Sequence, residues 1–399
     1  MTLRTLGLVL LLATPAVAAD WPQLLGPTRD GQSAETKLNW DWAKAPPAVT
    51  WAADVGAGFA GPVVSGGVVY VWHRVGDEDT LTALAADTGK PKWKYAAAVA
   101  GRDGPQAAPV VAGETAFCLG YGGKLHAVST KTGDKVWVKD LMKEYKPPEG
   151  YFGVGAGLLV ADGKVIVNVG AKGAGVVAFD AKTGDEAWKA TDDPPSYSTP
   201  TLADIDGTPH AVVFTRTGVV VLSVATGKVK YTQRHRSRME ASVNAATPLV
   251  AKDQIFATAS YGTGAALWAM GKGELTEVWA NDTSLSSQYD TPVKVGDHLY
   301  GLNGRQDAGP ANLVCVEWQT GAVKWTQKKF GVAHLIVVDG GVLAITEGGE
   351  LVRFAADVKE YKELGRAKVL DGLTRAAPAL SDGRLFLRND KQLAAVKLR

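Results

Sequence analysis

Stretches in which apolar and polar residues alternate follow one another from Val49 to the end of the chain, separated by turns that contain glycine or aspartate. Alternation with a period of two predicts β-strands with one buried face, and this region shows no helical period. Pairs of such strands, joined by a short turn, are expected eight times. They fall at Gly61–Val71, Ala108–Cys118, Val154–Val167, Thr199–Phe214, Ala246–Ala257, Tyr289–Tyr300, Ala333–Ile345 and Arg375–Leu387.

A second motif follows these pairs, in which a small residue precedes an aromatic residue by ten positions with Thr-Gly between them. It occurs at Ala83 and Trp93, Ala127 and Trp137, Ala178 and Trp188, Val221 and Tyr231, and Cys315 and Trp325. Ala269 and Trp279 are expected to keep this spacing without Thr-Gly, and a seventh copy around Phe354 to Leu364 has lost both the Thr-Gly and the tryptophan. Because glycine supplies the positive φ of a tight turn, each copy predicts a hairpin of two further strands.

Two strand pairs per repeat give four antiparallel strands, at the roughly 40 to 50 residues expected of a propeller blade. The sequence therefore predicts an all-β protein, an eight-bladed β-propeller. The eighth repeat ends at Leu393–Leu398 without its last strand, whereas Val49–Trp51 is a strand with no repeat of its own. We expect these N- and C-terminal strands to pair and close the ring, which removes the exposed sheet edges.

The tryptophans of the second motif are large enough to fill the gap between neighbouring sheets, and the small residue before each leaves room for the ring. The predicted docking residues are Trp51, Trp93, Trp137, Trp188, Trp279 and Trp325.

The motif is complete at Ala178, Asp180, Thr183, Gly184 and Trp188, where it resembles the tryptophan-docking motif of the PQQ-binding-like propeller family. The resemblance covers nearly the whole chain after residue 20, and Asp20-Trp21-Pro22-Gln23 is similar to the lead-in of many secreted bacterial members. The family includes quinoprotein dehydrogenases and BamB-like propellers of outer-membrane protein assembly. Because the motif stabilises blades in enzymes and scaffolds alike, the resemblance implies the fold rather than an activity.

The first residues predict a secretory signal. Arg4 precedes an apolar stretch from Leu6 to Leu12, and Ala16 to Ala19 are small residues suited to cleavage. The expected organisation is a signal at residues 1–19, a lead-in at 20–48 and the propeller at 49–399. Every apolar run is far shorter than the ~20 residues that span a bilayer. We therefore expect a periplasmic or secreted monomer with no transmembrane segment.

Charge and cysteine content narrow the possible partners and chemistry. A formal net charge of +2 gives no reason to expect nucleic acid as a partner. Cys118 and Cys315 lie in apolar stretches of different repeats, and we interpret them as buried free thiols.

The sequence predicts no catalytic residues and no metal site. None of the six histidines has a partner at metal-ligand spacing. Asp204-Ile205-Asp206-Gly207 is interpreted as a hairpin turn, and the glycine-rich run at 153–157 as a bend. No cofactor is expected. The alternative is PQQ with calcium, but quinoprotein alcohol dehydrogenases use adjacent cysteines near the quinone, and this chain has none.

One segment concentrates charge, Arg234-His235-Arg236-Ser237-Arg238. It follows the outer strand of the fourth repeat, so it should share a face with Arg305 and Asp307 of the sixth. We interpret Arg234, His235, Arg236, Arg238, Arg305 and Asp307 as a candidate surface for an envelope or secreted protein partner. The expected function is a non-catalytic interaction scaffold, BamB-like in its role. The alternatives are a PQQ-dependent oxidoreductase and a propeller that binds a polysaccharide or small ligand.

Overall fold

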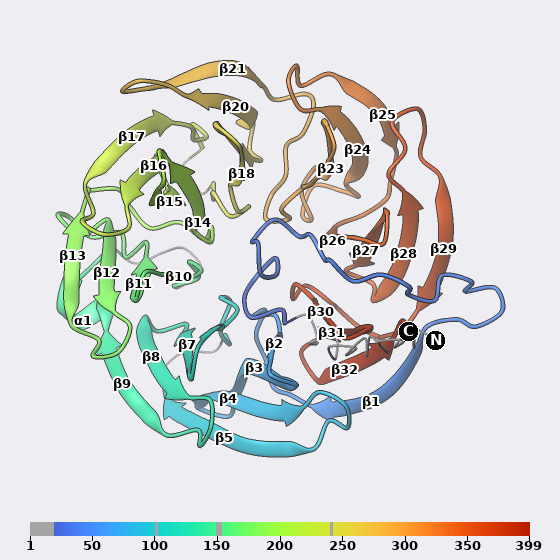
Figure 1. Ribbon diagram of the computed structural model, residues 1–399, viewed down its shortest axis with the longest axis horizontal. Helices are drawn as coiled ribbons and strands as arrows, with labels where there is room; N and C mark the ends of the chain where they lie inside the picture. Colours follow the sequence, from blue (N-terminus) through green and yellow to red (C-terminus); the bar gives the residue numbers. More distant parts are fainter. Residues whose placement is uncertain (1–19, 100–102, 149–153, 240–241) are drawn as a thin grey trace, which may run out of the picture.

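The computed structural model describes residues 20–99, 103–148, 154–239 and 242–399, and the signal predicted at 1–19 lies outside them. The strands form eight four-stranded antiparallel sheets arranged as the blades of a ring (Figure 1), which confirms the predicted all-β, eight-bladed propeller. The chain runs from the inner to the outer strand of each blade before it enters the next.

Seven blades are continuous in sequence, and the eighth is assembled from both ends of the chain. The first four are β2–β5 (Val63–Ser65, Val68–Val75, Glu78–Ala85, Pro91–Ala98), β6–β9 (Val110–Ala112, Thr115–Leu119, Lys124–Ser129, Lys135–Asp140), β10–β13 (Leu159–Ala161, Lys164–Val167, Val176–Asp180, Glu186–Ala190) and β14–β17 (Thr201–Ile205, Thr208–Phe214, Gly218–Ser223, Val229–Arg234). The others are β18–β21 (Leu249–Ala251, Gln254–Ala259, Gly264–Met270, Leu275–Asn281), β22–β25 (Val293–Val295, His298–Asn303, Asn312–Glu317, Val323–Gln327), β26–β29 (Ala333–Val338, Gly341–Thr346, Glu350–Ala355, Glu363–Lys368), and β30–β32 (Ala379–Ser381, Arg384–Arg388, Gln392–Lys397) with β1 (Ala48–Asp54).

Pairing of β1 with β32 closes the ring as predicted. The two strands are antiparallel, with Ala48 opposite Lys397 and Asp54 opposite Gln392. The N-terminal strand β1 is thereby the outermost strand of the last blade, and it covers the edge of β32 that would otherwise be exposed.

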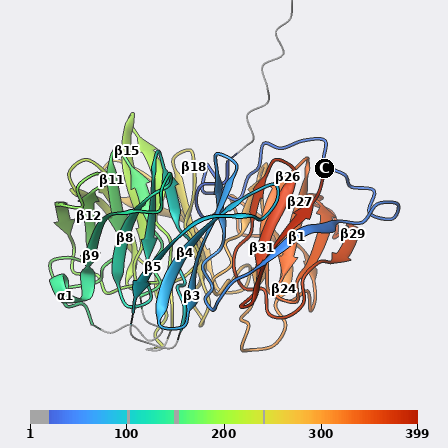
Figure 2. The same ribbon diagram turned by 90° about the horizontal axis from the view of Figure 1, so that it is seen from below.

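The two faces of the ring, seen edge-on in Figure 2, carry different connections because consecutive strands of each blade run in opposite directions. Turns between the second and third strands of a blade, and connections from each outer strand to the next inner strand, lie on one side, which we call the channel face. Turns between the first and second strands and the Thr-Gly turns lie on the other, the turn face. The interpretation of Asp204–Gly207 as a hairpin turn is confirmed, because it joins β14 to β15 and the Asp204 carboxylate accepts from the Gly207 N–H at 2.9 Å.

Helical structure is slight. The five-residue helix α1 (Leu141–Tyr145) follows β9, a departure from the expectation that helix would be absent, and its N-terminus is capped by the Asp140 carboxylate. Within the described ranges, no helix has the length and apolar character needed to cross a bilayer.

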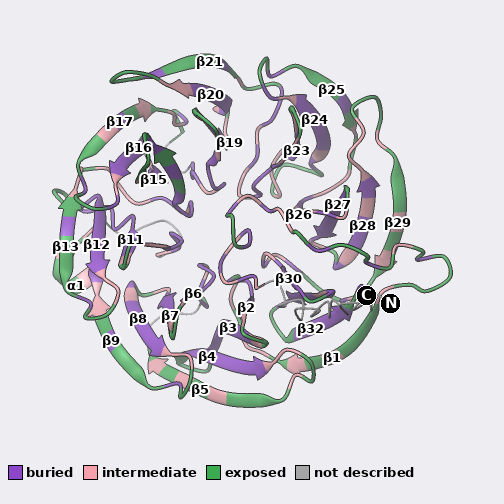
Figure 3. Ribbon diagram, in the orientation of Figure 1, coloured by how far each residue is buried: buried purple, intermediate pink, exposed green. Residues whose placement is uncertain are grey.

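The core lies between the blades, on the second and third strands (Figure 3), while the outer strands expose alternate residues. Both cysteines belong to this core. Cys118 in β7 and Cys315 in β24 are buried free thiols in separate blades, as predicted.

The tryptophan docking contact has two parts that join each blade to the next. The indole N–H of Trp137 in the second blade donates to the Ala181 carbonyl of the third at 3.1 Å. The same ring lies flat against Gly184 of the third blade's Thr-Gly turn, where a Cβ would come within 2.7 Å of it. The corresponding indole hydrogen bonds are Trp51 to Ala86, Trp93 to Thr130, Trp188 to Val224, Trp279 to Trp318 and Trp325 to Asp357. Glycine in the turn is therefore needed for the neighbour's ring as well as for its own φ.

The predicted spacing is wrong in the fifth blade. Trp279 pairs with Leu267, twelve residues earlier, rather than with Ala269. The docking pair is the aromatic residue of the outer strand together with the residue opposite it on the third strand. In these blades the register of the two strands shifts directly after this pair, so the shift marks the docking position even where the hairpin is longer. In the seventh blade the same shift follows Arg353 and Gly365, so the copy expected at Phe354 to Leu364 is displaced and its docking position is a glycine.

The missing aromatic ring of the seventh blade is supplied by the lead-in. Trp42 packs over Gly365, where a Cβ would meet its ring at 2.9 Å, and its indole N–H donates to the Asn39 carbonyl at 3.0 Å. The indole N–H of Trp40 beside it donates to the Asp339 carboxylate at 2.8 Å. The centroid of the Trp40 ring lies 4.2 Å from Arg353 Cζ, at the centre of the guanidinium group. The lead-in therefore fastens the outer strand β29 from outside the repeat.

The docking contact can be isolated by two substitutions in the third blade. Gly163 and Gly184 both have positive φ, at 67° and 77°, but only Gly184 faces a tryptophan ring, since nothing lies within 4 Å of a Cβ at Gly163. Gly163→Ala should lower the free energy of unfolding by about 1 to 2 kcal/mol from backbone strain. Gly184→Ala should lower it by a further ~1 to 3 kcal/mol, because the added methyl group displaces Trp137. Urea unfolding measures both, and equal losses would contradict the role given to the ring contact.

Candidate functional site

The lead-in lies across the central channel on the turn face, as the blue segment at the centre of Figure 1 shows. The backbone of Trp21 exchanges two hydrogen bonds with Val64 of the first blade. On the far side of the ring, Gly31 accepts from the Val337 N–H at 2.8 Å, and Gln32 donates to the Lys294 carbonyl at 2.7 Å. The channel therefore has a floor on the turn face and opens toward the channel face.

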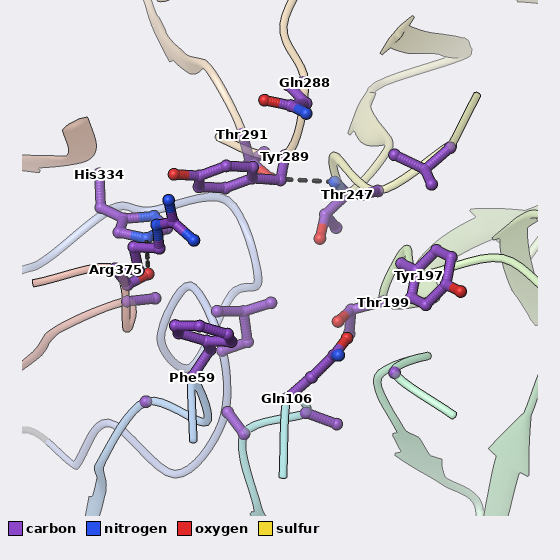
Figure 4. A pocket seen from close by; sticks show the side chains of 18 of the residues that line it. Phe59, Gln106, Tyr197, Thr199, Thr247, Gln288, Tyr289, Thr291, His334 and Arg375 are labelled. Carbon is purple, nitrogen blue, oxygen red and sulfur yellow. Dashed lines mark hydrogen bonds between the residues drawn. The ribbon is translucent and has the colours of Figure 1, made fainter. Parts of the chain in front are cut away.

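Above this floor lies a cavity of 310 Å³, which we call the central cavity (Figure 4). Leu24 and Leu25 of the lead-in line its base, and each of the eight blade-to-blade connections or the strand that follows it contributes to its wall. Its size is at the lower end of the roughly 300 to 1,000 Å³ of ligand pockets.

The cavity wall follows a rule that is visible in the sequence. In six blades a proline stands directly before the inner strand. The residue before each of these prolines lines the cavity: Gly61, Ala108, Thr199, Thr247, Thr291 and Ala377. The residues two positions earlier form a second layer: Phe59, Gln106, Tyr197, Ala245, Tyr289 and Arg375. A residue before proline is held in an extended conformation, in which alternate side chains point the same way. Our sequence reasoning missed this signal, and with it the cavity.

One side of the central cavity carries a hydrogen-bonded polar cluster. The Glu347 carboxylate accepts from the Tyr289 hydroxyl at 2.7 Å and from Arg375 Nε at 3.2 Å. His334 Nε2 lies 2.8 Å from the Arg375 carbonyl. Burial raises the pKa of the Tyr289 hydroxyl and lowers the pKa of His334, so both remain neutral near pH 7. The Arg375 and Glu347 charges offset each other, and the cluster carries no net charge.

Behind this cluster, the Asp290 carboxyl is buried 3.6 Å from His334 Nδ1. Burial and the nearby Glu347 raise the pKa of Asp290 well above its ordinary value. Both effects disfavour a negative charge on this wall of the cavity.

The arginine segment lies beside the mouth of the channel. Arg234, Arg236 and Arg238 line a second, open cavity on the channel face, which we call the arginine cavity. Within the described ranges, none of the three forms an ion pair with a carboxylate. Their positive charge lines an open cavity and meets no described carboxylate there.

The other members of the predicted surface are placed differently. The His235 ring packs against Phe214 and Trp268, with centroids 5.9 and 5.3 Å away, and burial lowers its pKa. Arg305 shares the channel face with the arginine segment, but its guanidinium is held by both carboxylate oxygens of Asp307, at 2.9 and 2.5 Å. Of the six residues predicted for this surface, the three arginines are therefore the cations that no described carboxylate pairs with.

Tyr261 separates the two cavities and lines both. It lies in the turn between β19 and β20 with a φ of 66°, and Gly262 after it has 71°. Two positive φ angles define a hairpin turn that favours Asn-Gly, and a non-glycine residue in this region costs about 1 to 2 kcal/mol. A bulky ring is thus kept where a smaller residue would be more stable.

Three neighbours hold the strained tyrosine. The Arg305 guanidinium lies 4.4 Å from the ring centroid, Gln288 Nε2 donates to the Tyr261 hydroxyl at 3.0 Å, and Ser237 Oγ donates to its carbonyl at 2.6 Å. Backbone strain that is fixed by its surroundings is typical of functional sites. The only sequence signal is Tyr-Gly in a turn where Asn-Gly is expected.

The fold and the channel define a closed PQQ-like β-propeller whose channel opens on one face. The chain belongs to the PQQ-like propeller family whose model is described as outer membrane protein assembly factor BamB, and that model matches residues 40–145 and 100–327.

Among known proteins, the chain is similar to the quinohemoprotein alcohol dehydrogenase ADH-IIG of Pseudomonas putida, with 28% identity over 225 residues. The alignment covers 47% of this chain and 30% of that enzyme, so the chain spans less than a third of the relative it matches.

Two solved structures are also similar. BamB from Moraxella catarrhalis has a TM-score of 0.67 and 16% identity, with 88% of this chain and 98% of that one covered. Quinohemoprotein alcohol dehydrogenase from Comamonas testosteroni also has a TM-score of 0.67, with 14% identity and 95% and 80% covered. At these identities the likeness shows the fold alone.

The strain at Tyr261 predicts an unusual mutational response. Tyr261→Asn loses the contact with Arg305, worth roughly 0.5 to 1 kcal/mol, but regains a similar amount because asparagine tolerates this conformation. The free energy of unfolding should change by less than about 1 kcal/mol. Tyr261→Val loses the same ring and retains the strain, so it should cost about 2 kcal/mol or more. Urea unfolding of both variants measures the difference, and an equal cost would show that the turn is not strained.

Proposed function

We propose that this protein is a non-catalytic scaffold of the periplasm or the extracellular space, which acts as a monomer and binds a protein partner on its channel face. The observation that carries the proposal is the arginine cavity, where three arginines without a carboxylate partner among the described residues stand beside the open end of the channel. Arginine forks bind carboxylates in a bidentate manner, which suits acidic groups of a partner.

The arrangement of the channel supports this face over the turn face. The lead-in occupies the channel on the turn face, whereas the channel face has two adjoining cavities. Family membership supports a scaffold role, because the matching family model is named for a protein assembly factor.

The similarity to an alcohol dehydrogenase makes a PQQ-dependent oxidoreductase the second candidate. The side chains of the central cavity do not fit that group. PQQ is a tricarboxylate, and the cavity lining contains a single arginine, Arg375, whose charge is already paired with Glu347. Among the described residues, no three His, Cys, Asp or Glu side chains are grouped as a metal site, and the two cysteines lie in separate blades.

The scaffold proposal predicts that the arginines are needed for capture but not for folding. Replacing Arg234, Arg236 and Arg238 by Ala should change the free energy of unfolding by about 0.5 kcal/mol or less per site. The variant should retain much less partner than the wild type in affinity capture from an envelope extract, measured by quantitative mass spectrometry.

The matched control for this experiment removes the same charge from the turn face. Lys90, Lys182 and Lys228 are exposed beside Thr-Gly turns, and their replacement by Ala should leave capture unchanged. Loss of capture in the lysine variant with full capture in the arginine variant would place the binding surface on the turn face.

The poor fit of PQQ leads to a separate prediction. Titration of the protein with PQQ and Ca²⁺, followed by absorbance and by dye-linked oxidation of alcohols, should show no binding in the micromolar range. Micromolar binding accompanied by alcohol oxidation would instead establish the oxidoreductase.

A further inference from the structure

The two cavities of the channel face adjoin each other and differ in charge. Tyr261 is common to both linings. On one side of it stand Arg234, Arg236 and Arg238. On the other side, Arg375 is paired with Glu347, and Arg305 at the boundary is paired with Asp307. A ligand that fills both cavities must therefore carry negative charge at one end and none at the other.

The central cavity suits an uncharged side chain with hydrocarbon character. Leu24, Leu25 and Phe59 offer apolar surface at its base and side, and burial of such surface favours an apolar group. The Gln288 and Gln306 side chains line the cavity near Tyr261, where amides can donate to and accept from the peptide groups of an extended chain.

The arginine cavity suits several carboxylates rather than one. Its three arginines fall within five consecutive residues and line a single open cavity. Arg236 donates only to the neighbouring Ser237 carbonyl, at 3.3 Å, among the hydrogen bonds of the described residues. Three neighbouring positive charges repel one another, and bound carboxylates offset this repulsion. Several carboxylates do so better than one, which favours an acidic segment over a single acidic residue.

We infer that the partner presents an extended acidic segment whose carboxylates lie on Arg234, Arg236 and Arg238 and whose adjoining uncharged side chain enters the central cavity beside Tyr261. This inference rests on the proposed function and names the partner's chemistry. The apolar base of the central cavity favours a protein segment over an anionic polysaccharide, which has no hydrocarbon side chain to bury there. The strained backbone of Tyr261 is then explained by its ring, which forms the wall between the two halves of the ligand.

The test measures direct binding of short fluorescein-labelled peptides by fluorescence anisotropy. The probe has a run of glutamates next to one leucine, and it should bind the wild type with an affinity that falls as sodium chloride is raised. Replacing the glutamates by lysines should abolish binding, and replacing the leucine by glycine should weaken binding measurably, by roughly three- to tenfold.

Variants of the protein separate the contributions of the two cavities. The triple variant Arg234→Gln, Arg236→Gln and Arg238→Gln should weaken binding of the glutamate peptide by at least about tenfold. Tyr261→Asn should weaken it several-fold while leaving the unfolding transition nearly unchanged. The matched control is the triple variant Lys90→Gln, Lys182→Gln and Lys228→Gln on the turn face, which should bind the glutamate peptide as tightly as the wild type does.

Three results would overturn the inference: equal binding of the lysine peptide, no effect of the leucine, or full displacement of the peptide by heparin at a far lower concentration than by unlabelled peptide. Failure of this inference can be told apart from failure of the proposed function. If the arginine variant loses its captured partner but the acidic peptide does not bind even the wild type, the scaffold proposal stands and the acidic segment is wrong.

Discussion

The structure depends on one contact, the packing of a flat indole ring from one blade against the glycine of the next blade's turn. Each sheet of a propeller twists away from its neighbour, so the gap between sheets widens toward the rim and needs a large side chain to fill it. The indole N–H finds a carbonyl of the next blade at 2.8 to 3.1 Å, so the ring is buried without an unsatisfied donor. Repeated around the ring, the contact fixes the angle between blades, and the angle fixes how the inner strands converge on the channel.

The arginine segment and Tyr261 lie at a seam where this contact departs from the rule. Between the fourth and fifth blades the docking residue is Tyr231, whose hydroxyl donates to the Gly271 carbonyl at 2.7 Å, and the fifth blade lacks Thr-Gly. The strand that carries Tyr231 continues directly into the arginine segment, and the fifth blade contributes the strained turn of Tyr261. Natural proteins tend to break local rules at functional sites, and this seam combines three such departures.

Sequence periodicity predicted the blades and the ring closure because both rest on local alternation and on turns only a few residues long. It failed where a hairpin is longer, as at Leu267 and Trp279, because without Thr-Gly nothing in the sequence marks the pairing. Trp42 on Gly365 could not be predicted, since the lead-in has no periodicity and the contact joins distant parts of the chain. The arginines were found as a charge cluster. Tyr261 was missed because the sequence shows its residue type and not its φ, and the ion pair of Arg305 with Asp307 depends on side-chain placement.

The central claim is that the partner binds over the arginine and central cavities of the channel face. Hydrogen–deuterium exchange of the propeller, free and in complex with its captured partner, tests this claim most directly because it maps the covered backbone without altering a residue. The account predicts slower exchange in the complex at Ser237–Met239, Tyr261–Thr263 and Tyr289–Thr291, with the Thr-Gly turns unchanged. Slower exchange confined to the Thr-Gly turns and the lead-in, with these three segments unchanged, would contradict it.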